Sequence, residues 1–80
     1  MMPKAEQLYR ILAFPKHLQN TILTLLRLGA ATALEVSKVT GKAWAVESMY
    51  LNTLVVMKIV RKERVCRKAV FSVIVEALDW

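Results

Sequence analysis

The densest group of chemically active side chains lies between residues 58 and 68. This segment holds six of the chain's 12 lysines and arginines and a single acid, Glu63. The six are Lys58, Arg61, Lys62, Arg64, Arg67 and Lys68. Guanidinium and ammonium groups form charge-assisted hydrogen bonds with phosphate oxygens. A cluster this dense at one place therefore favours contact with a phosphate backbone over a merely solvated face.

The charge and the apolar content of the whole chain narrow the class of protein. The formal net charge is +6, which favours polyanionic partners. At 56% hydrophobic, the 80 residues are more apolar than is usual for a small soluble monomer. Pairing of two chains is the simplest way to cover such surface, because a small domain gains core by pairing. We therefore expect one domain, residues 1–80, that forms a homodimer.

The remaining reactive residues give no basis for catalysis. The chain has one histidine, His17, and one cysteine, Cys66. These two residues are too few for a spaced set of Cys and His metal ligands, and they do not form a plausible catalytic triad with the scattered acids. A single cysteine also cannot form an internal disulfide. We predict no enzymatic activity, no metal and no cofactor, with His17 at the surface. For Cys66, a redox switch or an intermolecular disulfide is the alternative to an incidental thiol.

Charged residues interrupt every apolar stretch. Arg27, Lys58 and Glu76 keep each run well short of the roughly 20 apolar residues that a membrane-spanning helix needs. The first ten residues carry charges and do not resemble a secretory signal. These features predict a soluble protein located in the cytoplasm.

The elements that would position the basic cluster begin with a helix over residues 15–28. Proline is well placed in a first helical turn, and Gly29 is a natural stop. Its apolar stripe consists of Leu18, Ile22, Leu25 and Leu26. Residues 1–14 form a separate segment in which Leu8, Ile11 and Leu12 have helical spacing.

Two more helices follow. Thr32 and Glu35 fit a capping box, and Gly41 ends the short helix that this box begins. Val36 and Val39 are its expected core contacts. A third helix over residues 43–57 should place Leu51, Leu54, Val46 and Tyr50 on its inner side.

The pattern changes after Lys58. "IVRKERV" and "AVFSVIV" are rich in β-branched residues and predict a β-hairpin over residues 58–76. The residues between them include no glycine, proline or asparagine. We therefore expect an irregular or mobile tip and not a tight two-residue turn.

This order of elements resembles the winged helix-turn-helix family of DNA-binding regulators, which is common among archaeal and viral transcription regulators. The matching pieces are "TALEVSKVTG", "ESMYLNTLVVMKIVRK" and "AVFSVIV". The resemblance implies an α+β, mainly helical fold: a helical core over residues 15–57, a wing over 58–76 and an extra N-terminal helical segment. The sequence departs from the family at Lys58, where glycine is common, and at Glu47, where an apolar residue is common.

The resemblance also implies how the protein would work, as a small homodimeric regulator that binds double-stranded DNA sequence-specifically. The third helix would lie in the major groove, with Lys42, Trp44, Ala45, Ser48 and Asn52 near the bases. The wing would contact phosphates or the minor groove through Arg61, Lys62, Arg64, Arg67 and Lys68. The structural alternatives are that Trp44 packs on the preceding helix and that Asn52 is only a solvated polar residue.

Two questions stay open at this point. The expected dimer interface is Leu8, Tyr9, Ile11 and Leu12, with Ala77, Leu78 and Trp80 as a further possibility, although either group could instead complete the core of one chain.

The apolar third helix, with Val46, Met49, Val55 and Val56, also supports a second function. In that case the chain would be a winged-helix protein-interaction module of a larger assembly.

Overall fold

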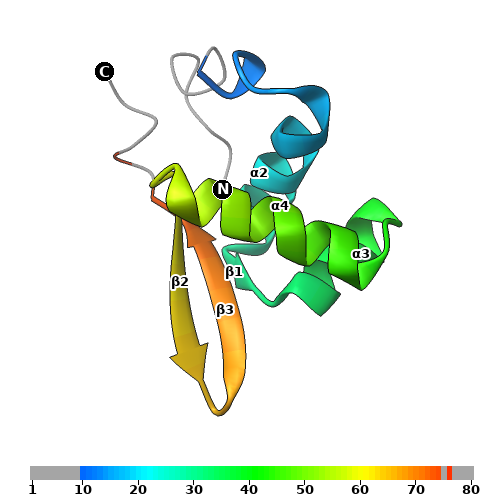
Figure 1. Ribbon diagram of the computed structural model, residues 1–80, viewed down its shortest axis with the longest axis vertical. Helices are drawn as coiled ribbons and strands as arrows, with labels where there is room; N and C mark the ends of the chain where they lie inside the picture. The colour runs from blue at the N-terminus through cyan, green and yellow to red at the C-terminus, as the bar shows by residue number, and fades with distance from the viewer. Residues whose placement is uncertain (1–9, 75, 77–80) are drawn as a thin grey trace.

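The computed structural model describes residues 10–74 and 76, which form three helices and a three-stranded antiparallel sheet (Figure 1). A short helical turn at residues 10–12 precedes them. The elements are α2 (Lys16–Leu28), β1 (Ala30–Ala31), α3 (Ala33–Thr40), α4 (Trp44–Val56), β2 (Val60–Val65) and β3 (Lys68–Val73). This arrangement confirms the predicted α+β, mainly helical winged helix-turn-helix fold, with each predicted helix displaced by one residue or less.

Helices α2 and α3 form as their sequences predict. The apolar stripe of α2 is buried along its whole length. The amide of Glu35 donates to Thr32 Oγ1 at 3.2 Å and the amide of Thr32 donates to Glu35 Oε1 at 2.9 Å, which completes the capping box of α3. Gly41 then takes a left-handed conformation, with a φ of 78°, and turns the chain toward α4.

One core prediction for α3 is wrong. Val36 is fully buried, but Val39 is 49% exposed. The inner face of this helix passes through Ala33, Val36 and Ser37, so Val39 falls to the side of that face.

Helix α4 packs with Leu51 and Leu54 inward, as predicted, and also buries Glu47 completely. The two carboxylate oxygens of Glu47 accept hydrogen bonds from different elements. Thr21 Oγ1 of α2 donates at 2.8 Å and Thr40 Oγ1 of α3 donates at 2.6 Å. A buried carboxylate is tolerated when its oxygens find such donors. Glu47 therefore occupies the inner position that an apolar residue commonly holds, and it ties three helices together.

The end of α4 uses a left-handed residue that is not glycine. Lys58 has a φ of 62°, and the amide of Ile59 donates to the carbonyl of Leu54 at 3.0 Å while the amide of Lys58 donates to the carbonyl of Val55 at 3.0 Å. These two bonds are those of a Schellman motif, in which the left-handed position favours glycine. The backbone of Lys58 is strained because a side chain with a Cβ atom crowds the carbonyl oxygen in the left-handed conformation.

The wing is a regular hairpin, and the expectation of an irregular tip is wrong. Strands β2 and β3 pair from Val60 opposite Val73 to Val65 opposite Lys68, which leaves Cys66 and Arg67 as a two-residue turn. Both turn residues have positive φ, 50° and 69°. Positive φ at both positions is typical of a type I′ turn, whose twist matches that of the flanking strands. Strand β3 also pairs with the two-residue strand β1, which the sequence did not predict.

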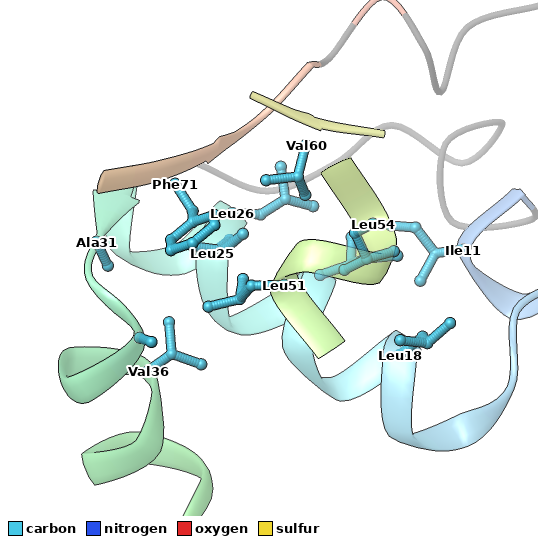
Figure 2. Packing of buried hydrophobic residues seen from close by; sticks show 12 residues of the cluster. Ile11, Leu18, Leu25, Leu26, Ala31, Val36, Leu51, Leu54, Val60 and Phe71 are labelled. Carbon is cyan, nitrogen blue, oxygen red and sulfur yellow. The ribbon is translucent and has the colours of Figure 1, made fainter. Parts of the chain in front are cut away.

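The core lies between α2, α4 and the inner face of the sheet. Figure 2 shows Phe71 and Val60 of the sheet above Leu25, Leu26 and Leu51 of the helices. Ile11, from the segment before α2, reaches toward Leu54 and Leu18 and is only 1% exposed. The described part of the N-terminal segment therefore contributes to the core of its own chain.

Candidate nucleic-acid interface

A groove of about 310 Å³ lies between the wing, α4 and the start of α3. Figure 1 shows α4 crossing at the base of the hairpin, which extends away from the helices. The lining residues come from four elements or their caps: Thr32, Ala33, Leu34, Trp44, Ser48, Asn52, Lys62, Lys68, Ala69 and Phe71. The fold thus brings predicted recognition-helix residues and predicted wing residues to one surface.

On the helix side of this groove stand Trp44, Ser48 and Asn52, which follow one another at intervals of four residues. Trp44 is 58% exposed, so it does not pack into the core. The Asn52 side chain is held at both ends. Its Nδ2 donates to the carbonyl of Ser48 at 2.9 Å, and its Oδ1 accepts from Lys62 Nζ at 3.3 Å.

Two of the predicted recognition residues lie elsewhere. Ala45 is exposed on α4 but does not line the groove. Lys42 turns away from the wing, and its Nζ lies 5.2 Å from the centre of the Tyr50 ring. The other neighbour of Tyr50 is His17, with ring centres 4.7 Å apart. Lys42 therefore lines a second pocket, next to α2.

The five predicted wing cations are all exposed, and they divide between the two faces of the hairpin. Residues directly opposite in an antiparallel pair point to the same side. Lys62 is opposite the buried Phe71 and Arg64 is opposite Ala69, so both stand on the face that turns toward α4. Lys62 Nζ lies 5.8 Å from the centre of the Phe71 ring.

The other wing cations surround this face. Arg61, opposite Ser72, stands on the outer face, and Arg67 is in the turn. Lys68 lines the groove and lies near the capping box of α3. Hydrogen bonds from the backbone and side chain of Thr32 lower the pKa of Glu35, and the charges of Lys68 and Lys38 lower it further.

The residues of the groove that sequence reasoning missed are Thr32, Ala33, Leu34, Ala69 and Phe71. Phe71 and Ala69 belong to the return strand, and the other three belong to the start of α3. Nothing in the local sequence marks them, because only the packing of the hairpin against the helices brings them together.

Among residues 10–74 and 76, no three His, Cys, Asp or Glu side chains gather in an arrangement that could hold a metal ion. The helices described here are too short or too polar to cross a membrane.

Cys66 is an exposed free thiol in the turn of the wing.

Comparison with known sequences identifies a relative. No protein-family model matches the chain. An uncharacterised protein of Archaeoglobus fulgidus is 44% identical over 57 residues, which cover 71% of this chain and 77% of that protein.

Two solved structures resemble the fold. The AntR antimony-specific transcriptional repressor superimposes with a TM-score of 0.71 at 20% identity over 89% of this chain, and this chain spans only 63% of that protein. A predicted DNA-binding transcriptional regulator from E. coli superimposes with a TM-score of 0.73 at 21% identity, covering 94% of this chain and 78% of that one. The chain therefore belongs to the same family as the A. fulgidus protein, and its fold is the winged helix-turn-helix.

Proposed function

We propose that the protein binds double-stranded DNA as a transcription regulator, with α4 in the major groove and the β2–β3 wing on the backbone. The observation that carries this proposal is the groove in which Asn52 and Ser48 of α4 face Lys62 and Lys68 of the wing. Polar side chains for base edges and cations for phosphates then lie side by side, as a DNA duplex requires. Both similar structures are those of proteins named as transcriptional regulators.

On α4, each candidate residue has a distinct proposed role. Asn52 is suited to reading adenine, Ser48 to accepting or donating at any base, and Trp44 to stacking against sugar or base. Lys42 and Ala45 flank these residues at the start of the helix and would approach the backbone and a thymine methyl group, respectively. Sequence specificity would therefore depend most on Asn52, because its amide discriminates most strongly between bases.

On the wing, Arg61, Lys62, Arg64, Arg67 and Lys68 would contact phosphates or enter the minor groove. Each phosphate contact adds about 0.9 to the negative slope of log affinity against log salt concentration. Replacement of Arg61, Arg64, Arg67 and Lys68 by glutamine should therefore flatten that slope on random duplex DNA.

A matched pair of single variants sharpens the test. Arg64→Gln and Lys16→Gln each remove one positive charge, but Lys16 stands at the start of α2 and lines neither pocket. Only Arg64→Gln should make this negative slope shallower. Equal slopes for these two variants, together with an unchanged slope for the fourfold variant, would rule out contact through the wing.

The regulator would act as a homodimer through the N-terminal segment. Of the four residues expected at this interface, Leu8 and Tyr9 lie outside the described residues, as do Ala77, Leu78 and Trp80. Ile11 is in the core of its own chain, and Leu12 is 63% exposed. Leu12→Gln should therefore weaken dimerisation without unfolding the chain, which sedimentation at several concentrations would measure. On a twofold dimer, the two α4 helices would read half-sites about one helical turn apart.

Other parts of the proposal follow from this role. The 80 residues would act as one DNA-binding domain without catalytic activity, located in the cytoplasm at the nucleoid. The archaeal source of the A. fulgidus relative supports an archaeal origin.

A second candidate function is favoured by the outer side of α4. Met49 is 58% exposed and Val56 is 80% exposed, although a helix that faces DNA is normally more polar. Val46 and Val55 are half-buried beside them. The chain could therefore dock on another protein through this side of α4. Met49→Gln and Val56→Gln would then abolish assembly with that protein but leave DNA binding unchanged, whereas the wing variants would weaken DNA binding and leave the assembly intact.

A further inference from the structure

A second pocket, of about 280 Å³, lies where α2, the end of α3 and the turn before α4 meet. Its residues come from α2, from the end of α3 and from the turn before α4: Asn20, Leu23, Thr24, Arg27, Thr40 and Lys42. The α2 members lie at intervals of three and four residues and share one side of that helix. No residue of this pocket belongs to the groove beside the wing.

The hydroxyl groups of the pocket are engaged elsewhere. Thr24 Oγ1 donates to the carbonyl of Asn20 at 2.8 Å, and Thr40 Oγ1 donates to Glu47 Oε2 at 2.6 Å. A hydroxyl has one proton to donate, so neither threonine has one left for a ligand. The donors that remain among the lining side chains are the Arg27 guanidinium, the Lys42 ammonium and the Asn20 amide.

The charge of the pocket is positive. Two lining residues are cations and none is an acid. The lining residue Thr40 is hydrogen-bonded to Glu47, and both carboxylate oxygens of Glu47 already accept hydroxyl hydrogen bonds. Glu47 is also fully buried, so it offers a ligand no accessible negative surface. Two lining cations and no lining acid therefore leave the mouth of the pocket positively charged.

We propose that this pocket is a phosphate-binding site, with Arg27 and Lys42 as its two charged ligands and Asn20 as a neutral donor. An arginine fork can hold two oxygens of one phosphate group, and lysine adds a point charge. The inference goes beyond the proposed function, because the site would bind phosphate whether or not α4 enters a DNA groove.

The phosphate group could come from two sources. Lys42 immediately precedes α4, so the backbone of a duplex that holds the start of α4 would pass close to the pocket. Arg27 and Lys42 would then hold a phosphate of that backbone. Alternatively, the pocket has room for a small phosphorylated molecule, which would act as an effector.

The first experiment measures the binding of inorganic phosphate itself. An NMR titration at constant ionic strength, with chloride as the balancing anion, should give saturable shifts at Asn20, Arg27 and Lys42. Arg27→Gln and Lys42→Gln should weaken binding about tenfold or more, because each loses a charged hydrogen bond. Lys16→Gln, which removes one charge elsewhere on α2, should bind as the wild type does. Thermal unfolding of all four proteins checks that each is folded.

The second experiment identifies the source, by the salt dependence of binding to random duplex DNA. If backbone phosphate enters the pocket, the slope of log affinity against log salt concentration is shallower by about 0.9 for Arg27→Gln than for Lys16→Gln. Free phosphate then also competes with DNA. If a small molecule is the ligand, Arg27→Gln and Lys16→Gln have equal slopes, but Arg27→Gln still binds inorganic phosphate more weakly. The proposal is overturned if Arg27→Gln and Lys16→Gln have the same affinity for inorganic phosphate and the same salt dependence of DNA binding. Phosphate binding without any DNA binding would refute the proposed function and support this site.

Discussion

Lys62 of strand β2 and Asn52 of helix α4 are joined by a hydrogen bond of 3.3 Å from Lys62 Nζ to Asn52 Oδ1. The wing and the helix proposed to read DNA therefore meet at one polar contact. An asparagine reads adenine with both atoms of its amide, Oδ1 and Nδ2. In the free protein, Oδ1 accepts from Lys62 and Nδ2 donates to the carbonyl of Ser48, so entry of DNA would transfer Lys62 to a phosphate and free Oδ1 for a base.

This exchange predicts that the two residues act together on DNA. Asn52→Ala should cost about 1–3 kcal/mol of discrimination at one base pair of a site selected from random sequence. Lys62→Met should change the discrimination at that same base pair, because loss of the Lys62 ammonium frees Asn52 Oδ1. A double-mutant cycle on affinity measures the coupling. Effects that add to within about 0.5 kcal/mol would mean that Lys62 and Asn52 contact DNA independently.

Glu47 provides a test of what holds the helices together. Thr21→Val keeps the shape of the side chain but removes the donor to Glu47 Oε1. Loss of one partner of a buried hydrogen bond costs about 1–3 kcal/mol, so the free energy of unfolding should fall by about that amount. The matched control is Thr53→Val, whose hydroxyl is exposed on α4. Its effect should stay within about 0.5 kcal/mol. Equal effects in urea unfolding would contradict the role given to Glu47.

How far the sequence predicts this structure depends on whether the signal is local. The cap at Thr32, the stop at Gly41 and the apolar stripe of α2 all act within one or two helical turns, so their prediction succeeded. The partners of Glu47 and the strand β1 depend on contacts between distant segments, and no local pattern reveals them.

The candidate site divides in the same way. The basic residues of the wing and Asn52 could be chosen from the sequence, because residue type alone suggests their chemistry. The departure of Lys42 from the groove could not, since its direction is set by its contact with Tyr50. The tight turn at Cys66 and Arg67 was missed because glycine and asparagine, the usual signals of such turns, are absent.

Lys58 is expected to be a position where a smaller residue stabilises the fold. Its φ of 62° is unfavourable for any residue with a Cβ atom, whereas glycine adopts it freely. Lys58→Gly should raise the free energy of unfolding by about 0.5–1 kcal/mol. Lys58→Ala removes the same charge but keeps the strain, so it should bring no gain. Thermal unfolding of both variants compares them directly, and a gain in the alanine variant alone would exclude backbone strain as the cause.

The capping box predicts a dependence of stability on pH. Hydrogen bonds from Thr32 lower the pKa of Glu35 in the folded chain below its ordinary value of 4.5. The stabilisation is therefore complete above that value and is lost as the pH falls through the lowered pKa. Glu35→Gln keeps a capping-box residue that cannot titrate. Urea unfolding should show the wild type losing its advantage over Glu35→Gln below pH 4.5. Parallel pH profiles would contradict this role.

The central claim is tested most directly by the affinity of the wild-type protein for random duplex DNA at several salt concentrations, with the oligomeric state measured in the same buffer. The proposed function predicts a dimer whose affinity falls steeply as salt rises, because the wing and α4 displace counterions from the backbone. No binding even at low salt would contradict it. The basic wing would then be a solvated face, and the exposed side of α4 would become the surface to study.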